Sequence, residues 1–499
     1  MQLFRHFYFY LITTFFVIFL RVSAADLACP NEPISSDTSK GSFPVGGVTT
    51  FPANYICGIE FLIPDGWILK FIVQTDANST TGDEIVISDA VNVLNEFSPG
   101  ESLYYAPAKK SDVMISTKTN KSHFFFSWEF MNVTNYNRVQ QPVGSIIKLN
   151  LTSLNYYLFT SDKGPVTFHT ANINRQFDFE LAGIYVYDGE NLKAPYLGTL
   201  SQFVNQKELQ KSSGKSLTLV NFYGTSSYSY GLANNYNDVA GYSLYNFLLL
   251  TSDHGLQGNV DTQDTSAFTF YCVDSQETYL TDISILEHDA GGLLVQFQPM
   301  TPSNNMKTLL SYDSGNKNSN RMPQQILTNL FTMIVFKSQV SVHFDSGPQP
   351  IWTIPYPGRI GAIIPPSKWN PTVSPAYKTT FSSEITYTYK FNFEDVHIAK
   401  PGEKVRVEVG TNGITTGVVE FDHNVSNPGV RVANGTYMTT TFDAESSDSS
   451  FLITFEIEDI NPTMSSPTTV AHVETSTKST TRTFSDFSII LATVIFFMC

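Results

Sequence analysis

Alternating hydrophobic and polar residues are the dominant local pattern of this chain. From 385 to 393 large apolar residues occupy every second position, which predicts a half-buried strand with one aromatic face. A Lys-Pro-Gly-Glu turn at 400–403 leads into a second alternating run at 404–409. The aromatic stretch at 124–130 is expected to be a core strand. The best helical spacing is the short stretch 200–209, so the sequence predicts an all-β fold.

The N-terminal end begins with an apolar run at 7–20. This run follows Arg5 and precedes small residues, which is the order of a secretory signal peptide. A membrane-spanning helix is the alternative, but the run is shorter than the ~20 residues that such a helix needs. We therefore predict a signal peptide at 1–25, with cleavage after Ala24 or Ala25.

The C-terminal end has a Ser/Thr-rich stalk at 461–483 and then a hydrophobic tail at 484–499 with no basic residue after it. This order is typical of a GPI-attachment signal, whereas a stop-transfer helix is longer and is followed by Lys or Arg. We expect attachment at Ser476 or Ser479, loss of the tail with Cys499, and tethering to the outer leaflet of the plasma membrane. A tail that is retained, or that spans the membrane once, is the alternative.

Charge and cysteine content narrow the class of protein. The formal charge of −15 argues against a nucleic-acid partner, because phosphate binding needs clustered Lys and Arg. Four cysteines are too few for a disulfide-dense scaffold, so the core must provide most of the stability. Cys29 and Cys57 are close in sequence and are expected to pair. Cys272 is then left over, either buried or joining two chains.

Asn-x-Ser/Thr sequons agree with export from the cell. Several sequons in a chain with a signal peptide predict surface glycans. The acceptor residues are Asn78, Asn120, Asn132, Asn150, Asn424 and Asn434.

Four β-rich regions follow one another along the chain. We place them at 26–140, 141–273, 274–377 and 378–460. Proline-rich breaks between 349 and 366 mark the boundary between the third and the fourth region.

The first region has a recognisable order of residues. Cys29 is followed by Phe-Pro-Ala-Asn-Tyr-Ile-Cys at 51–57, an alternating strand at 59–63 and a Pro-x-Gly turn at 64–66. An acidic pair then flanks a short apolar strand at 84–88. This order resembles the CUB module, and specifically the divergent CUB-like proteins of nematodes. In the second region, 184–189 and 213–222 look like the same elements in the same order.

The resemblance implies tandem CUB-like antiparallel β-sandwiches of the jelly-roll type, with a hairpin at 64–66. It also implies a calcium site to which Asp83 and Asp89 would contribute, although no glutamate can be placed to complete it. Solvated loop carboxylates are the alternative reading of this pair. In the second region Asp188 matches the family, but Ala182 stands where the first aspartate should be, so we expect no calcium there. No other cofactor is expected.

No catalytic motif stands out in the sequence. There is neither a His-Glu-x-x-His zinc motif nor a Gly-x-Ser-x-Gly nucleophile elbow, and we predict that the protein is not an enzyme. Tyr223, Tyr228 and Tyr230 lie among Ser and Asn, where they can contact a partner or a glycan.

The leading hypothesis is a non-catalytic extracellular recognition protein that is tethered to the cell surface or secreted. Its expected ligand is an extracellular protein or a glycan, and the nematode resemblance implies a role in the innate immune or stress response. A secreted hydrolase with dispersed acidic residues is one alternative. A structural or adhesion coat protein is the other.

Overall fold

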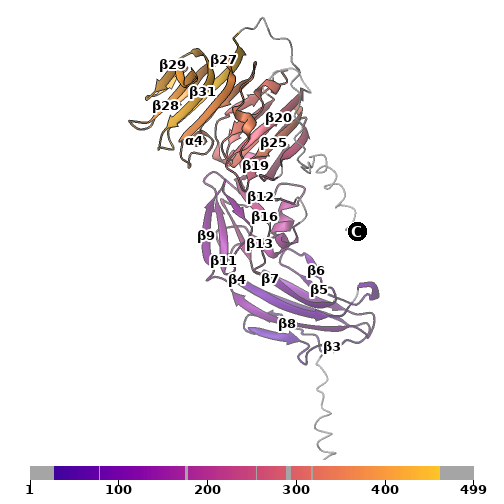
Figure 1. The fold of residues 1–499 in the computed structure, drawn as a ribbon. Helices are drawn as coiled ribbons and strands as arrows, with labels where there is room; N and C mark the ends of the chain where they lie inside the picture. Colours follow the sequence, from indigo (N-terminus) through magenta and orange to yellow (C-terminus); the bar gives the residue numbers. More distant parts are fainter. Residues whose placement is uncertain are drawn as a thin grey trace, which may run out of the picture. The chain divides into compact units, whose positions relative to one another are not determined.

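The computed structural model describes residues 27–460, except 78, 175–177, 254, 288–293 and 316–317. The predicted signal peptide, stalk and tail, with Ser476 and Ser479, lie outside the described residues. Strands dominate this part of the chain, which confirms the all-β prediction (Figure 1). The helices are short: α2 Leu200–Val204, α3 Tyr236–Val239, α4 Pro366–Trp369, η1 Ser79–Thr81, η2 Phe179–Gly183, η3 Pro302–Asn304, η4 Asn318–Arg321 and η5 Pro350–Thr353. None of these helices is long and apolar enough to cross a bilayer.

The chain divides into two compact units. Unit 1 comprises Met1–Pro142, Leu149–Thr167 and Asp178–Ser227. Unit 2 comprises Val143–Lys148, Phe168–Phe177 and Tyr228–Cys499.

Unit 1 begins with an eight-stranded sheet in the order β2-β8-β4-β7-β5-β6, in which β1 pairs with β4 and β3 with β8. All of these pairs are antiparallel except β1 with β4. The strands are β1 Ile34–Ser35, β2 Lys40–Phe43, β3 Thr49–Thr50, β4 Ile56–Thr75, β5 Glu84–Ser88, β6 Leu94–Glu96, β7 Gly100–Ser116 and β8 His123–Asn132.

The hairpin expected at Pro64 and Gly66 is wrong. Both halves of β4 pair with the same neighbour, β7, and the register shifts between Ile63 and Ile68. The Pro-x-Gly segment at 64–66 is therefore a bulge inside one long strand. A bulge bends a strand and does not end it. Both halves contribute to the same core, where the rings of Phe61 and Phe71 meet edge to face at 5.1 Å.

The aromatic stretch 124–130 is a core strand, as predicted. It lies in β8, and Phe124, Phe126, Trp128 and Phe130 are buried. The core is closed at one end by the predicted disulfide between Cys29 and Cys57, whose Cα atoms are 5.5 Å apart.

A second sheet completes unit 1, in the order β14-β13-β15-β11-β9. Its strands are β9 Asn137–Pro142, β11 Asn155–Thr160, β13 Ile184–Tyr187, β14 Tyr196–Thr199 and β15 Ser216–Asn221. The pair β9–β11 is parallel, and the others are antiparallel. The expected helical stretch at 200–209 is the short α2, which follows β14.

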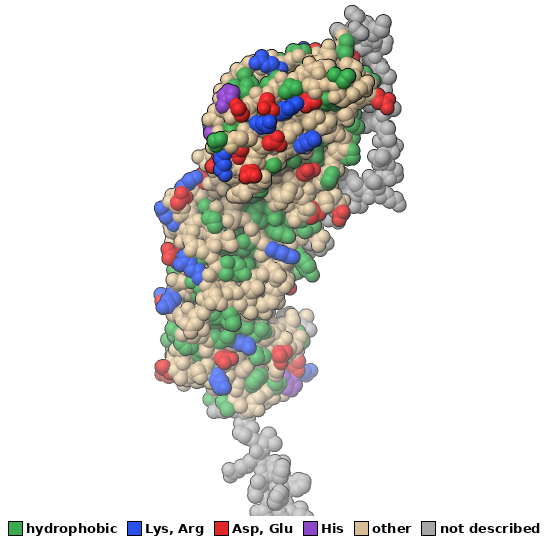
Figure 2. Space-filling view, turned by 60° about the vertical axis from the view of Figure 1, so that its left-hand side comes forward, with side chains coloured by type: hydrophobic (Ala, Val, Ile, Leu, Met, Phe, Trp, Pro, Cys, Tyr) green, Lys and Arg blue, Asp and Glu red, His purple; other side chains and the backbone are tan. Residues whose placement is uncertain are grey.

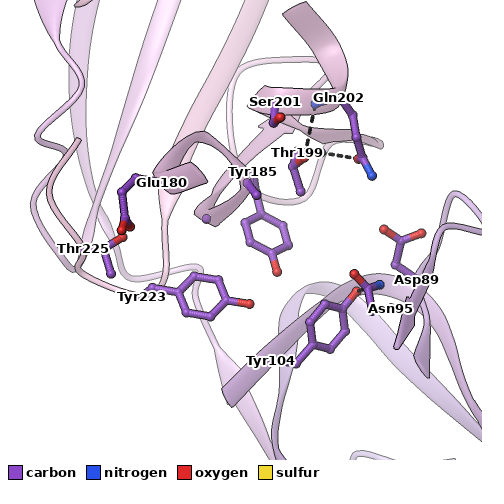
Figure 3. Close-up of a pocket in the computed structure, with 12 residues that line it drawn as sticks. Asp89, Asn95, Tyr104, Glu180, Tyr185, Thr199, Ser201, Gln202, Tyr223 and Thr225 are labelled. Atoms are coloured by element: carbon purple, nitrogen blue, oxygen red, sulfur yellow. Dashed lines mark hydrogen bonds between the residues drawn. The ribbon is translucent and has the colours of Figure 1, made fainter. Parts of the chain in front are cut away.

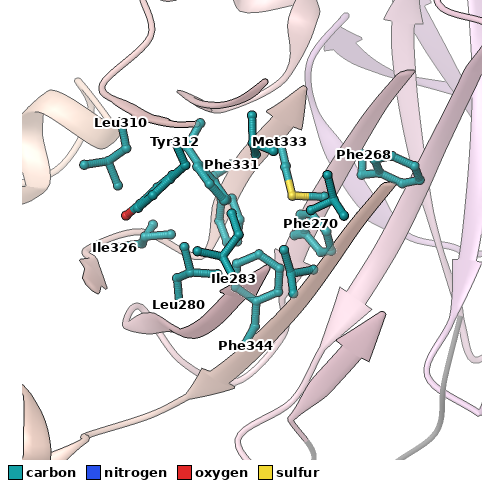
Figure 4. Close-up of a cluster of buried hydrophobic side chains, with 14 of the residues drawn as sticks. Phe268, Phe270, Leu280, Ile283, Leu310, Tyr312, Ile326, Phe331, Met333 and Phe344 are labelled. Atoms are coloured by element: carbon teal, nitrogen blue, oxygen red, sulfur yellow. The ribbon is translucent and has the colours of Figure 1, made fainter. Parts of the chain in front are cut away.

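Unit 2 contains a small sheet, β10-β16-β12, and two larger ones, β17-β19-β24-β21-β22 and β18-β25-β20-β23. The two larger sheets face each other across one apolar core, in which the rings of Phe270 and Phe344 lie 4.9 Å apart (Figure 4). The strands are β10 Ile146–Lys148, β12 Val166–Asn172, β16 Ser229–Asn235, β17 Leu244–Leu250, β18 Leu256–Asp261, β19 Thr265–Cys272, β20 Thr278–Glu287, β21 Val295–Pro299, β22 Leu310–Tyr312, β23 Gln324–Ile326, β24 Leu330–Phe336 and β25 Ser338–Ser346.

The boundary expected at 273/274 falls inside this pair of sheets, between β19 and β20. Each larger sheet takes strands from both sides of that position, because the successive strands from β17 to β21 alternate between the two layers. Local hydrophobic patterning carries no information about this alternation.

The last sheet of unit 2 has the order β26-β32-β27-β31-β28-β29, with β30 on β27. Its strands are β26 Ile360–Ile363, β27 Tyr377–His397, β28 Lys404–Thr411, β29 Ile414–Phe421, β30 Val425–Ser426, β31 Val430–Asp443 and β32 Ser450–Asp459. The aromatic face predicted at 385–393 is buried from Tyr387 onward, but Ile385 is 61% exposed. The reason is a register shift between Ser382 and Tyr387, which breaks the alternation.

Basic and acidic side chains are intermixed on the outer side of this last sheet (Figure 2). Arg406 pairs with Glu408 at 2.8 Å, and Lys404 pairs with Glu420 at 3.3 Å. Exposed pairs of this kind add little stability, so the face is best described as a solvated surface.

Candidate functional site

The candidate site is a pocket of about 450 Å³ in unit 1, between the first and the second sheet. In Figure 3 the hydroxyls of Tyr185 and Tyr223 point into it from one side, and Tyr104 and Asn95 face them from the other. The lining residues are Asp89, Asn95, Tyr104, Glu180, Ala182, Gly183, Tyr185, Thr199, Ser201, Gln202, Tyr223 and Thr225.

One wall comes from the turn between β5 and β6. Asp89 directly follows β5, and its Oδ1 accepts hydrogen bonds from the amides of Val91 at 3.0 Å and Val93 at 2.9 Å. An aspartate that binds the backbone two residues ahead is a typical turn former. Asn95 is held in the next strand, because its Nδ2 donates to the carbonyl of Ile87 at 3.2 Å and to the hydroxyl of Tyr104 at 3.0 Å.

The opposite wall is built at the ends of β14 and β15. Thr199 and Gln202 form a capping box at the start of α2, in which the Thr199 amide donates to Gln202 Oε1 at 2.8 Å. The loop after β15 is set by Asn221, whose Oδ1 accepts from the amides of Tyr223 at 2.9 Å and Gly224 at 3.1 Å. The capping box and the Asn221 turn both orient polar side chains before any ligand is present.

Tyrosines join the two walls. The Tyr185 hydroxyl donates to the carbonyl of Tyr105, and the Tyr105 amide donates to the Tyr223 hydroxyl at 3.4 Å. The rings of Tyr105 and Tyr223 also meet edge to face at 4.9 Å. These contacts cross from one sheet of unit 1 to the other and hold the pocket at a defined width.

Burial controls the charge state of the pocket. Desolvation, together with the negative charge of Asp89, raises the pKa of Tyr104 well above its usual value. Burial likewise raises the pKa of Tyr185 and of Tyr223. The three phenols are therefore protonated at neutral pH and can donate hydrogen bonds. Burial also raises the pKa of Asp89, although the amides of its turn act in the opposite direction.

The two predicted calcium ligands do not share a site. Asp83 and Asp89 lie at opposite ends of β5, which puts them roughly 20 Å apart at ~3.3 Å per residue. Asp83 is buried and binds its neighbouring loop, accepting from the Lys118 amide at 2.6 Å and from the hydroxyl of Ser122 at 2.7 Å. In the part of the chain that the structure describes, no three His, Cys, Asp or Glu side chains are grouped to hold a metal ion.

Hydrogen bonds determine the acidity of Asp83. Burial acts to raise its pKa, but bonds from Thr119, Ser122 and the Lys118 amide outweigh that effect and lower it to about 2. This carboxylate has a structural role. Calcium binding by this chain stays a prediction, and these two aspartates cannot ligate one ion together.

The predicted glycosylation sites that the structure describes are exposed, whereas the unpaired Cys272 is buried. The five described sequon residues (Asn120, Asn132, Asn150, Asn424 and Asn434) are all exposed, and Asn78 lies outside the described residues. Their glycosylation stays a prediction. Cys272 is 1% exposed, and its Sγ lies 3.5 Å from Oδ1 of Asp274. A thiol buried in this way does not fit the alternative of a bond between two chains.

Of the tyrosines singled out in the sequence, only Tyr223 lines the pocket. Tyr228 is 74% exposed, and Tyr230 lies on β16 with its ring 5.6 Å from that of Tyr271. Sequence reasoning missed Tyr104 and Tyr185, because both lie in strands whose apolar pattern makes a tyrosine look like a core residue.

Among the described residues of unit 2, Glu277, Leu327 and Pro366 line both a pocket of about 380 Å³ and one of about 520 Å³. In the larger one, Tyr377 donates to Gln325 at 2.7 Å, and Gln325 donates to the Tyr279 hydroxyl at 2.9 Å. These polar groups satisfy one another, so they are less available to a ligand than those of unit 1.

Comparisons with known proteins identify the module that forms one wall of the pocket. Residues 24–134 match the family model of the CUB-like domain. The CUB1-EGF-CUB2 domains of rat MASP-1 are similar at 9% identity over 63% of this chain and 99% of that chain, with a TM-score of 0.17. The full extracellular region of zebrafish Gpr126/Adgrg6 is similar at 10% identity over 64% of this chain and 53% of that chain, with a TM-score of 0.18. No curated protein matches this chain.

Proposed function

We propose that this protein is a non-catalytic recognition protein of the cell exterior that holds its ligand in the tyrosine-lined pocket of unit 1. Residues 24–134 form a CUB-like domain, and such domains are typically extracellular recognition or adhesion modules. The observation that carries the proposal is that buried, protonated tyrosines and the hydrogen-bonded side-chain amides of Asn95 and Gln202 line one pocket. A preformed pocket with a few oriented polar groups is the usual form of a ligand site.

Several features support a location outside the cell. A structural disulfide such as Cys29–Cys57 is typical of oxidising compartments, and the five described sequon residues lie on the surface. The N-terminal signal peptide would direct export, and a GPI anchor at Ser476 or Ser479 would tether the mature protein. The resemblance to nematode CUB-like proteins supports a role in the innate immune or stress response.

The composition of the pocket supports binding rather than catalysis. Its lining residues include no histidine, cysteine or lysine. Its two acidic residues are Asp89, which binds the amides of its own turn, and Glu180 at the end of the opposite wall. A hydrolase that acted in this pocket would have to use these two carboxylates, and a coat protein would not need the pocket at all.

The test is a pull-down with the glycosylated ectodomain, 26–460, on microbial surfaces and host membrane extracts. Ser201→Trp places an indole in the pocket, and Ser153→Trp is the matched control on an exposed loop away from it. We expect the native chain and the control to bind, and the Ser201 variant to lose binding. Equal binding by both variants would place the ligand elsewhere. Self-association of the native chain without any ligand would favour the coat protein.

Tethering has a separate test on cells that express the full chain. Phosphatidylinositol-specific phospholipase should release the protein into the medium. If the protein stays on the membrane after treatment, the tail is retained. N-terminal sequencing of the released chain should begin at Ala25 or Asp26.

A further inference from the structure

The pocket of unit 1 also indicates its ligand, in an argument that rests on the proposed function. We infer that it binds a neutral or amine-bearing sugar unit of a glycan, and that it excludes anionic sugars. Three properties of the pocket lead to this ligand class: the balance of free donors and acceptors, the sign of its charge, and its size.

Donors and acceptors are both left over on the pocket lining. The Tyr104 hydroxyl accepts from Asn95, but its own proton has no acceptor among the described residues. The hydroxyl of Thr225 is buried and also has no partner there. Acceptor capacity remains on the Asn95 carbonyl and on the Glu180 carboxylate. A ligand group that donates and accepts at once satisfies such a mixed lining, and the sugar hydroxyl is that group.

Charge distinguishes among sugars. The lining contains Asp89 and Glu180 but no lysine, arginine or histidine. A uronate, sialate or sulfate would therefore meet two carboxylates with no cation to balance them, and like charges at close range repel. A neutral hydroxyl donates to these carboxylates, and a sugar amine would pair with them.

Size and shape agree with a sugar ring. A volume of about 450 Å³ is in the usual range for small ligands, ~300–1,000 Å³, and leaves room for one or two sugar units. The phenol rings of Tyr104, Tyr185 and Tyr223 enclose the space in Figure 3, and aromatic faces offer contact area to the apolar C–H faces of sugars. The side chains are also oriented in advance, since Asn95 and Gln202 are held by hydrogen bonds within their own walls.

The experiment titrates methyl glycosides into the glycosylated ectodomain by calorimetry. The panel contains mannoside, galactoside, N-acetylglucosaminide, glucosaminide with a free amine, and glucuronide. We expect at least one neutral or amine-bearing glycoside to bind and the glucuronide to show no heat. The same sugars, as oligosaccharides, should compete with the surface binding seen in the pull-down.

Two variants test the assignment to this pocket. Tyr104→Phe keeps the ring and removes the spare donor, and Glu180→Gln keeps the shape and removes the charge. Each should weaken binding about fivefold, which corresponds to one lost hydrogen bond. Glu180→Gln should also reduce the preference for the amine-bearing sugar. Tyr157→Phe is the matched control, because that hydroxyl contacts Thr152 and does not line the pocket.

Every outcome decides the matter. Surface binding that no sugar competes with, or sugar binding that neither variant weakens, would overturn the inference and leave the proposed function standing. Preferential binding of the glucuronide would overturn the charge argument. Cleavage of any glycoside would overturn the non-catalytic part of the proposed function as well. No binding to any surface or sugar would overturn both.

Discussion

Arg359 offers a sharp test of how unit 2 is held together. The side chain is fully buried, and no described carboxylate pairs with it. Its guanidinium lies 5.1 Å from the ring centres of both Trp352 and Phe381 and 5.5 Å from that of Tyr356. It also donates to the carbonyl of Ile354. Burial lowers its pKa to about 10, so the group is still charged at neutral pH.

The expected cost of substitution follows from these contacts. A desolvated cation–π contact is worth up to about 2 kcal/mol, and a hydrogen bond from a charged donor about 1.5–3 kcal/mol. Burial of the charge costs several kcal/mol in the opposite direction. We therefore expect Arg359→Ala to destabilise unit 2 by about 3 kcal/mol, because it also loses the packing of the stem. Arg359→Met keeps most of that packing and should cost about 1–2 kcal/mol.

Native-state hydrogen exchange with mass spectrometry is the suitable assay, because a chain of two units need not unfold in one step. The Arg359 guanidinium packs on Phe381 of β27 and on Phe455 of β32. Peptides from these two strands should therefore exchange faster in both variants, and more so in Arg359→Ala. Peptides from β4 in unit 1 are the internal control and should not change. A Met variant as stable as the native chain would refute the reasoning, since it would mean that desolvation cancels the contacts.

Three further predictions follow from other buried or constrained groups. Burial lowers the pKa of His169 to about 4, below its ordinary value of 6.5, so between these pH values the unfolded chain binds more protons than the folded chain. The stability of unit 2 should therefore fall by up to about 3 kcal/mol as the pH drops from 6.5 to 4. His169→Phe should flatten this pH profile when stability is measured by hydrogen exchange. Replacing Cys29 and Cys57 with Ser opens a loop of 28 residues and should lower the stability of the CUB-like domain by about 3–4 kcal/mol in urea unfolding; an unchanged midpoint would contradict the chain-entropy estimate. Peptide-N-glycosidase should reduce the mass of the secreted chain, and Asn132→Gln and Asn434→Gln should each remove one glycan in mass spectrometry, whereas an unchanged mass would show an empty sequon.

Local periodicity predicted the strands well, because the pattern that defines a strand is contained in the strand itself. The buried valines of β28 and the aromatic face of β8 are examples. Errors arose where a strand continues through a residue that usually ends one. At Pro64 and Gly66 the turn signal was strong, but β7 runs alongside both halves of β4 and keeps them in one sheet. Pairing partners decide such cases, and a single segment does not contain them.

The pocket was beyond sequence reasoning for the same reason, on a larger scale. Asp89 and Thr225 are 136 positions apart in the sequence. They line one cavity because the two sheets of unit 1 pack together through contacts such as the hydrogen bond from Tyr185 to the carbonyl of Tyr105. Asp89 shows the physical point most clearly. Its resemblance to a calcium ligand is real at the level of residue type, since it directly follows a strand as the family pattern requires. In the folded chain one of its oxygens binds the amides of its own turn, and Asp83 binds a loop at the other end of β5. Asp89 cannot form an ion site with Asp83. It instead lines a pocket together with three tyrosines and Glu180, and this lining favours a hydroxyl-bearing ligand.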